Sequence, residues 1–175
     1  MIVFIFMTIF ELKHQKKKEA LKRIKKMKLE FKHPPILKLF ENTGKYSQMV
    51  AQLGIPIVAN CEHHEVQFHG EVFIAYVPDK WLVGLSKLAR VSEYFLNPTV
   101  KTMQEKATEQ ILNHLEKRIK SKGIIVVVKA NHGCISLRGV KKPSLTVTMA
   151  TSGCFSESEK NFRNEFLDLV NSYKK

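Results

Sequence analysis

Two short clusters of cysteine and histidine are the residues in this sequence whose types and spacing best suit chemistry. The first reads CEHH at residues 61–64, and the second reads HGC at residues 132–134. Zinc binds cysteine sulfur and histidine nitrogen in tetrahedral sites, and three protein ligands leave a fourth position for water. A pair spaced like Cys61 and His64 can chelate one ion from a tight turn, with Cys134 brought in from a distant segment. The clusters therefore predict a zinc site.

The clusters offer more donors than a closed metal site takes. The candidate donors are Cys61, His63, His64, His132 and Cys134. Histidines that do not bind the metal are free for proton transfer, which is what a catalytic site requires. Two other interpretations stay open from spacing alone: a structural zinc site, and side chains that bind no metal and are simply packed or exposed to solvent.

A second group of polar residues, within VGLSKLAR at residues 83–90, suits a phosphate. On a helix, Ser86 and Arg90 are four positions apart and Lys87 and Arg90 three apart, so their side chains share a face. A hydroxyl, an ammonium and a guanidinium together can bind phosphate oxygens, and arginine can contact two oxygens at once. Arg138, which follows the second cluster, could join them. The alternative is a solvated basic helix face.

The hydrophobic pattern places these groups on the helices and strands of an α+β protein. Apolar repeats every three to four residues indicate helices, and short β-branched runs indicate strands. We expect helices at residues 11–32, 80–95, 97–122 and 157–170. We expect strands at residues 55–59, 66–77 (a hairpin or bulged pair broken by Gly70), 124–130, 134–137 and 145–151.

The N-terminal part of the chain differs in composition from the rest. The chain has 175 residues and a formal net charge of +13, and residues 11–33 hold ten Lys or Arg against three Glu. We expect residues 1–35 to form an apolar and Lys-rich helical arm, and residues 36–175 to form one compact domain. A solvated helix is the simplest interpretation of the basic run, and contact with nucleic acid is the alternative. The opening MIVFIFMTIF is too short to span a bilayer, so we expect no membrane segment.

The cysteine content favours a reducing compartment. Three cysteines, an odd number in a Lys-rich chain, argue against a disulfide framework. We therefore expect a cytoplasmic protein, in which cysteines more often serve metals or chemistry. Cys154 has no histidine nearby in the sequence and is expected to be a small buried residue.

Six motifs in order resemble the GTP cyclohydrolase I family, from about Phe40 to the C-terminus. They are CEHH at 61–64, IAYVP at 74–78, VGLSKLAR at 83–90, QE at 104–105, HGCISLRGVKKP at 132–143 and RNEFL at 163–167. The family hydrolyses the imidazole ring of GTP, releases formate and recloses the product as 7,8-dihydroneopterin triphosphate. This reaction is the first step towards folate, other pterins or 7-deazaguanine compounds. The resemblance implies the same activity, with Zn²⁺ as cofactor.

The resemblance also implies a role for each polar residue. Cys61, His64 and Cys134 match the zinc ligands, a choice of His64 over His63 that spacing does not make. His63 and His132 match the histidines that transfer protons. The residues that match substrate contacts are Ser86, Lys87, Arg90 and Arg138 for the triphosphate, Glu105 for the guanine, and Gln104 in the same pocket.

By resemblance the fold is the tunnelling fold, a four-stranded antiparallel sheet backed by helices, here with an N-terminal basic helical arm. The family forms pentameric rings stacked into decamers, with active sites at subunit interfaces. The expected partners are therefore GTP and further copies of the chain.

Departures from the family pattern keep two alternatives open. The N-terminal region lacks the family's usual TPER-type motif, which contributes a triphosphate contact, so a different guanine nucleotide such as dGTP is an alternative substrate. The second alternative is a non-catalytic, zinc-stabilised protein that binds nucleic acid through its Lys-rich arm, although nucleic acid is not the partner we expect.

Overall fold

The computed structural model describes residues 15, 18–19, 33–138, 140–156 and 161–173. The chain divides into two compact units, Met1–Pro34 and Pro35–Lys175. In the first unit, Gln15, Lys18 and Glu19 are helical, and the rest of the helix expected over residues 11–32 lies outside the described residues. Among the helices of the described residues, none is both long and apolar enough to cross a membrane.

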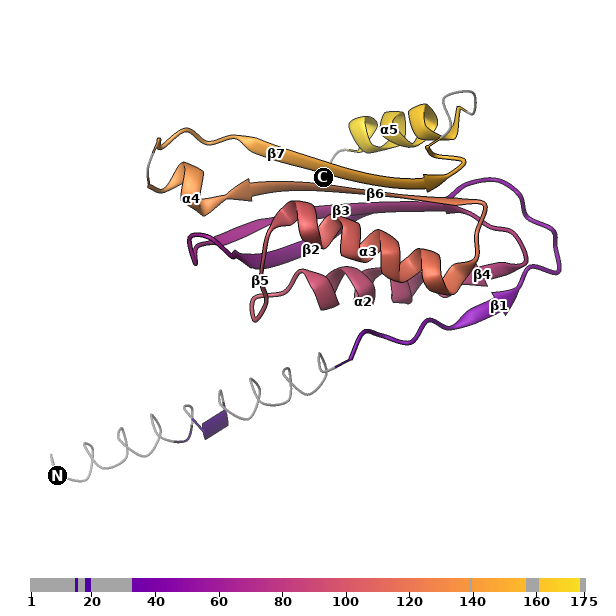
Figure 1. Cartoon of the computed structure of the whole chain (residues 1–175), viewed down its shortest axis with the longest axis horizontal. Coiled ribbons are helices and arrows are strands. Elements are labelled where there is room, and N and C mark those ends of the chain that lie inside the picture. The colour runs from indigo at the N-terminus through magenta and orange to yellow at the C-terminus, as the bar shows by residue number, and fades with distance from the viewer. Residues whose placement is uncertain (1–14, 16–17, 20–32, 139, 157–160, 174–175) are drawn as a thin grey trace, which may run out of the picture. The chain divides into compact units, whose positions relative to one another are not determined.

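The second unit is built on a mostly antiparallel sheet (Figure 1). Its strand order is β5-β2-β3-β6-β7, with β5 pairing in parallel and the four long strands pairing antiparallel. A separate two-stranded sheet pairs β1 with β4. The strands are β1 Leu39–Glu41, β2 Val50–Cys61, β3 Gln67–Val77, β4 Trp81–Val83, β5 Lys101–Thr102, β6 Gly123–His132 and β7 Leu145–Gly153.

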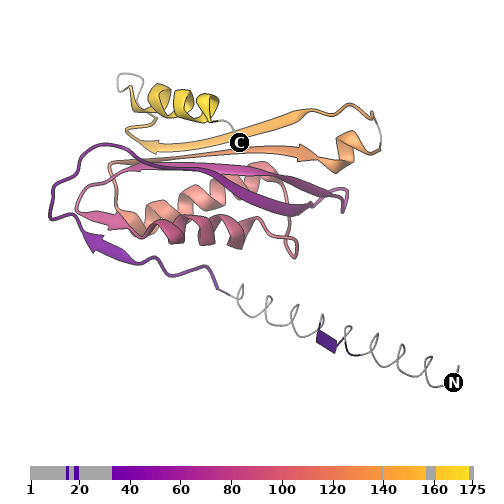
Figure 2. The same ribbon diagram turned by 180° about the vertical axis from the view of Figure 1, so that it is seen from behind.

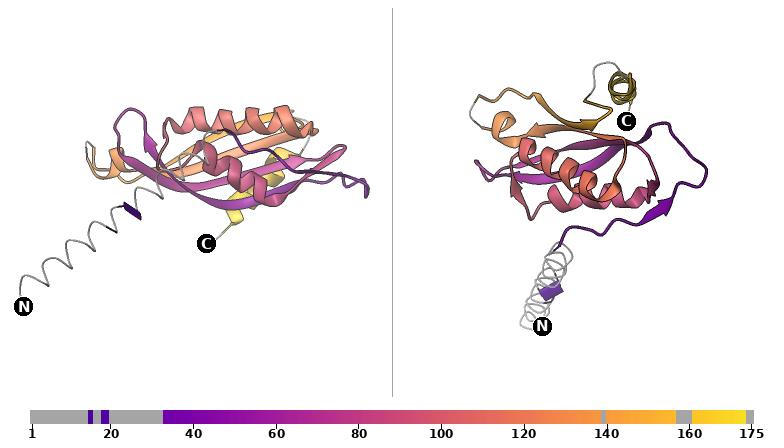
Figure 3. Two further views of the ribbon diagram at one scale, coloured as in Figure 1. Left: turned by 90° about the horizontal axis from the view of Figure 1, so that it is seen from below. Right: turned by 45° about the vertical axis from the view of Figure 1, so that its right-hand side comes forward.

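Helices cover both faces of this sheet (Figures 2 and 3). The helices are α2 Leu85–Phe95, α3 Gln104–Ile119, the single turn α4 Gly133–Ser136, and α5 Phe162–Ser172. Helices α2 and α3 lie on one face and α5 lies on the other. The predicted α+β class is confirmed, although the sheet has a fifth, two-residue strand beyond the four expected.

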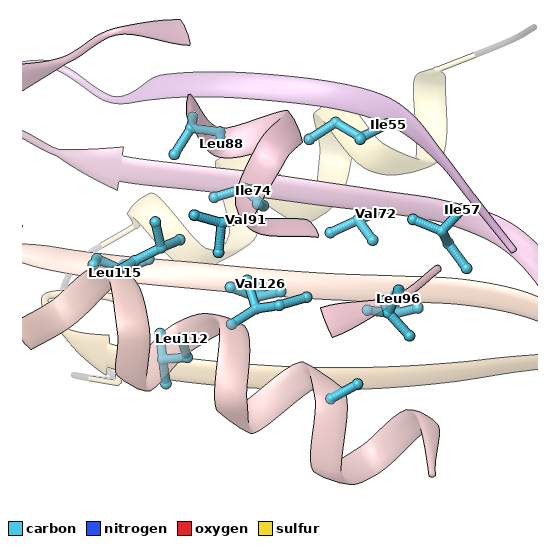
Figure 4. Packing of buried hydrophobic residues seen from close by; sticks show 14 of the residues in the cluster. Ile55, Ile57, Val72, Ile74, Leu88, Val91, Leu96, Leu112, Leu115 and Val126 are labelled. Atoms are coloured by element: carbon cyan, nitrogen blue, oxygen red, sulfur yellow. The ribbon is translucent and has the colours of Figure 1, made fainter. Parts of the chain in front are cut away.

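The second half of strand β3, from Val72 to Val77, is buried on both faces because helices cover both sides of the sheet. Ile74 and Tyr76 pack into the core with α2 and α3, and Phe73 and Ala75 pack into the core with α5. Successive side chains of a strand point to opposite faces, so this doubly covered part of the strand is apolar at every position. Figure 4 shows the first of these cores, where α2 and α3 contact Val126 and neighbouring strand residues.

The hairpin expected within residues 66–77 is wrong. This segment is the single strand β3, and Gly70 pairs with Ala130 of β6 in an unbroken register. A Cβ atom at Gly70 would collide with the carbonyl oxygen of Lys129. The glycine therefore reflects close approach of two strands rather than a turn.

The helix expected over residues 80–95 begins later, at Leu85. The preceding residues of β4 pair with β1, so their apolar side chains belong to a strand. The next helix begins at Gln104 rather than after Asn97. The Asn97 side chain instead donates to the carbonyl oxygens of Glu93 and Tyr94, so it satisfies the end of α2 instead of starting α3.

The strand expected over residues 134–137 is also wrong, because this segment forms the turn α4. The backbone N–H of Leu137 donates to the carbonyl oxygen of Gly133. A Cβ atom at Gly133 would contact Val66 and the backbone of Gln67, so the turn passes tightly against the start of β3. The turn brings Cys134 back towards the end of β6, which an extended strand would not do. The predicted strands at residues 124–130 and 145–151 are confirmed as parts of β6 and β7.

Candidate metal centre and active site

The two Cys/His clusters meet because the strands that carry them end at the same edge of the sheet. Cys61 is the last residue of β2, and His132 is the last residue of β6. Both strands pair with β3, and His132 stands opposite Phe68 near the start of that strand. The donor atoms of Cys61, His132 and Cys134 all lie within 4.8 Å of one another. Residues about seventy positions apart in the sequence therefore form one cluster.

The second predicted ligand of the first cluster, His64, lies in the turn that follows β2. Its Nδ1 atom is 3.6 Å from the Sγ atom of Cys61. With Zn–S near 2.3 Å and Zn–N near 2.0 Å, two ligand atoms of a tetrahedral zinc site are separated by about 3.6 Å. The turn is held by the N–H of Glu65, which donates to the carbonyl oxygen of Cys61, and Glu65 has a positive φ of 56°.

The donor set fits zinc, and it offers two histidines for the third position. The sequence prediction names His64, whereas the mutually close trio contains His132. Two thiols and an imidazole match the sulfur and nitrogen ligands that zinc takes. The assignment of His64 as ligand and His132 as proton-transfer residue stays a proposal, taken up below.

The Cys134 thiol holds its proton more strongly than an ordinary cysteine thiol does. Burial raises the pKa of the Cys134 thiol, and the neighbouring Cys61 raises it further, while Arg138 acts in the opposite direction. A coordinating metal ion overrides such a shift, because it deprotonates the thiol outright. Arg138 also donates from Nη2 to the carbonyl oxygen of His64 at 2.8 Å, so this predicted phosphate ligand lies beside the metal turn.

His132 is held on two sides. Its ring stacks on Phe68, with centroids 4.6 Å apart and planes 14° from parallel. Its Nε2 atom lies 2.7 Å from Oε1 of Gln104, the first residue of α3. Burial lowers the pKa of His132, and the carboxylate of Glu105 partly offsets that shift. The ring therefore favours its neutral form, which can accept a proton.

A cavity of about 390 Å³ joins these groups. Its lining residues are Cys61, His63, His64, Met103, Gln104, Glu105, His132, Cys134, Ile135 and Thr146. Seven of the predicted site residues therefore share one cavity. The start of α3 supplies the Gln104–Glu105 pair, and the ends of β2 and β6 supply the donors. The cavity therefore offers metal donors, histidines that could transfer protons and a carboxylate in one place.

The predicted phosphate ligands on α2 are not part of this cavity. Ser86 and Arg90 are exposed and Lys87 is half-buried. Helix α2 begins after β4, which follows the far end of β3, away from α4 (Figure 1). Within one chain, the structure therefore brings Arg138 to the metal centre and leaves the other three phosphate candidates on a separate surface.

A larger cavity, of about 550 Å³, lies beside β1 and β4. The side chain of Asn42 in its wall bonds to the backbone of Tyr46 and Asp79, and the lining contains neither cysteine nor histidine. Although this cavity is larger, its lining offers no metal-binding cysteine or histidine. The smaller cavity is therefore the candidate active site.

Fold and cavity together define a class: an α+β enzyme with a cysteine–histidine metal centre at one edge of an antiparallel sheet. Comparison with known proteins gives the family. The sequence profile of GTP cyclohydrolase I matches residues 10–171. The chain belongs to the GTP cyclohydrolase I family. The match begins within the segment expected to be a separate arm, well before Phe40.

Individual relatives agree over most of their length. GTP cyclohydrolase 1 from Sulfurihydrogenibium sp. (strain YO3AOP1) is 42% identical over 158 residues, which cover 88% of this chain and 82% of that protein. GTP cyclohydrolase 1 from Aquifex aeolicus (strain VF5) is 46% identical over 157 residues, covering 87% and 83%. The crystal structure of the archaeosine synthase QueF-Like in the apo form gives a TM-score of 0.43 at 12% identity, covering 58% of this chain and 92% of that one.

Sequence reasoning missed how Gln104 is used. Its side chain is 1% exposed, and its amide nitrogen is bonded to the backbone of β6 and β7 as well as to Thr148. A signal was present: Gln104 stands in helical register with the buried Ala107, Thr108 and Ile111. A polar residue on the apolar face of a helix needs buried hydrogen-bond partners.

Proposed function

We propose that the chain hydrolyses the imidazole ring of GTP, releases formate and recloses the product as 7,8-dihydroneopterin triphosphate. One observation carries the proposal: two thiols, three histidines and a carboxylate line the same cavity. Membership of the GTP cyclohydrolase I family supports the reaction type. The product would feed folate and related pterin synthesis.

We propose that Cys61, His64 and Cys134 hold the zinc ion. The 3.6 Å separation between Cys61 Sγ and His64 Nδ1 supports His64, because it equals the expected separation of two zinc ligands. Bound there, zinc supplies Lewis-acid chemistry and makes water a better nucleophile near neutral pH. This leaves His132, in the same cluster, facing the reacting part of the substrate.

His132 and His63 are the proposed proton-transfer residues. Opening a purine imidazole ring and releasing formate both require protons to move to and from ring nitrogens. Burial lowers the pKa of His132 and so favours its neutral form, and the contact with Gln104 fixes its orientation, so the ring can take up a proton and return it. His63 lines the same cavity, and its side chain is exposed to solvent.

Glu105 is the proposed guanine anchor. Its position in the first turn of α3 places the carboxylate in the cavity wall, next to Gln104. A carboxylate can accept hydrogen bonds from the guanine N1–H and the exocyclic amine. Adenine lacks this pair of donors, so Glu105 would discriminate against ATP.

The triphosphate would be shared between copies of the chain. Ser86, Lys87 and Arg90 lie away from the metal cavity of their own chain, which supports a site completed by a neighbouring subunit. The edge strand β7 also exposes a row of apolar side chains, Leu145, Val147 and Met149. An unpaired apolar edge is a natural interface. We propose pentameric rings, stacked into decamers, as in the tunnelling fold.

The test is product formation by the purified full chain loaded with zinc. Incubation with GTP should release formate and give a pterin that fluoresces after oxidation. Parallel incubations with dGTP and GMP decide the nucleotide, and we expect GTP to be turned over fastest. Faster turnover of dGTP would make dGTP the substrate instead of GTP. The absence of product from every guanine nucleotide at full zinc loading would overturn the proposed function.

We propose residues 36–175 as the catalytic domain and residues 1–35 as an arm, which the division of the chain after Pro34 supports. A cytoplasmic location is proposed with them. Cys61 and Cys134 carry free thiols, and a reducing compartment would keep them available to a metal.

A further inference from the structure

We infer that Gln104, Thr108 and Thr148 form a directional hydrogen-bond network that fixes the orientation and tautomer of His132. The expected effect on kcat rests on the proposed function. The orientation and tautomer of His132 are inferred from the geometry of the described residues alone. It makes Gln104 a positioning residue for the proton-transfer histidine, and it gives the two threonines a part in the same task.

The first step is the orientation of the Gln104 amide. Its Nε2 atom lies 3.0 Å from the carbonyl oxygen of Val128 and 3.2 Å from that of Thr146. Backbone carbonyl oxygens only accept hydrogen bonds, so the NH₂ group must face them. A flipped amide would press its oxygen against two carbonyl oxygens in a site that is 1% exposed. The amide oxygen therefore has to face the other way.

The second step is what that oxygen requires of His132. Oε1 of Gln104 lies 2.7 Å from Nε2 of His132, and an amide oxygen accepts but never donates. Nε2 must therefore carry a hydrogen. In the neutral ring the other nitrogen, Nδ1, is then the one with a free lone pair. The stacked ring of Phe68 stops the imidazole from leaving this plane.

The third step is the pair of hydroxyls that hold the amide. Thr108 Oγ1 lies 2.7 Å from the carbonyl oxygen of Gln104, so its hydrogen is donated there. Thr108 must then accept from Thr148, whose Oγ1 is also 2.7 Å away. With its hydrogen committed, Thr148 presents a lone pair to Gln104 Nε2 at 3.1 Å. The hydrogen bonds run in one direction around a closed loop.

This network crosses three elements that meet at the active site. Gln104 and Thr108 lie one turn apart on α3, Thr148 lies on β7, and Val128 lies on β6, the strand that ends in His132. A proton-transfer group gains from such support, because a ring that rotates or changes tautomer presents the wrong nitrogen to the substrate. The network thus links sheet packing to the chemistry of the cavity.

The test compares Gln104→Met, which removes the donors and the acceptor of the amide at nearly constant length, with Thr148→Val, which removes only one of the three acceptors around Nε2. We expect Gln104→Met to lower kcat roughly tenfold or more with KM within about twofold, as part of the ~10²–10⁴-fold that acid–base groups contribute. Thr148→Val should cause a clearly smaller loss, because the carbonyl oxygens of Val128 and Thr146 still orient the amide. Ser92→Ala, which removes a buried hydroxyl bonded to Leu88 on α2, is the matched control and should leave kcat unchanged.

A second readout does not depend on turnover: the crystal structure of zinc-loaded Gln104→Met. Without the amide oxygen as acceptor, we expect the His132 ring to rotate, with zinc content retained. A kcat of Gln104→Met within twofold of the parent, an equal defect in Thr148→Val, or an unchanged ring would overturn the inference. If Gln104→Met does not fold, Gln104→Glu takes its place with the same deciding outcomes, because its carboxylate cannot donate to the two carbonyls. If the parent does not turn over GTP, the proposed function is rejected. The crystal structure of the variant then decides the inference about the hydrogen-bond network.

Discussion

Nδ1 of His64 lies 3.6 Å from Sγ of Cys61 within one turn at the end of β2. This distance equals the separation expected of two neighbouring ligands of one tetrahedral zinc ion. Cys134 reaches the same place from α4, because that segment turns instead of extending. The local turn and the register of β3 with β6 together build the donor set.

The ligand assignment predicts different metal contents for neighbouring histidine variants. His64→Ala should lose a ligand and weaken zinc binding by more than roughly 100-fold, beyond the loss that outer-shell partners cause. His63→Ala is the matched control and should keep zinc while losing activity. Zinc per chain after dialysis against a weak chelator measures both. Zinc loss in His132→Ala together with zinc retention in His64→Ala would make His132 the third ligand instead.

The spatial separation of the phosphate candidates predicts complementation between subunits. Cys134→Ser should be inactive through its metal half, and Arg90→Ala should be impaired through its phosphate half. If each site takes one half from each of two subunits, random mixing restores about a quarter of the sites. Turnover by the two variants unfolded and refolded together, compared with each alone, measures this. Activity of the mixture equal to the mean of the two variants would show that each chain carries a complete site.

A buried histidine far from the metal predicts how stability depends on pH. Nε2 of His114 lies 3.2 Å from the carbonyl oxygen of Pro35 and so donates to it, and Nδ1 accepts from Arg118 at 3.3 Å. Burial lowers the pKa of His114, and the charge of Arg118 lowers it further, while the bond to Pro35 acts in the opposite direction. The neutral ring is therefore the form that the fold prefers.

Because the folded-state pKa of His114 lies below that of the unfolded chain, this stability is present above about pH 6.5 and is lost as the pH falls through the folded value. The thermal midpoint should fall from about pH 8 to about pH 5, and His114→Gln should flatten that fall. His69→Gln, on the exposed side of β3, is the control and should follow the parent. Parallel curves for parent and His114→Gln would contradict the assignment.

The core against α3 predicts a large loss of stability on truncation. Leu115 is fully buried between α3 and the sheet, so Leu115→Ala should lower the free energy of unfolding by about 2–5 kcal/mol. Leu169→Ala on α5, where the side chain is 41% exposed, should cost clearly less. Denaturant unfolding at one fixed protein concentration measures both. Equal losses would mean that α3 does not form the main core.

The sequence points to the candidate donors more directly than to the elements that carry them. Cysteine and histidine stand out at positions 61, 63, 64, 132 and 134 because few other residue types bind zinc, whatever the backbone does. The segment after His132 is short and apolar, and its turn depends on the contact of Gly133 with Val66, which local pattern cannot show. Tertiary packing decides such segments.

Likewise, the separation of α2 from the metal cavity cannot be seen in the order of motifs. Ser86, Lys87 and Arg90 share a helix face as expected, yet that helix starts at the opposite end of β3 from the metal centre. The role of Gln104 depends on Thr148, forty-four positions away, and on two backbone carbonyl groups. Hydrogen bonds over such separations follow from strand register, which the hydrophobic pattern alone does not specify.

The most direct measurement of the central claim is the formate released per GTP consumed by the zinc-loaded chain, alongside His132→Ala and Cys134→Ser. We predict equimolar formate from the parent. His132→Ala should release none while keeping its zinc, and Cys134→Ser should lose zinc and activity together. Consumption of GTP without formate, or formate release at the parent rate by His132→Ala, would contradict the account.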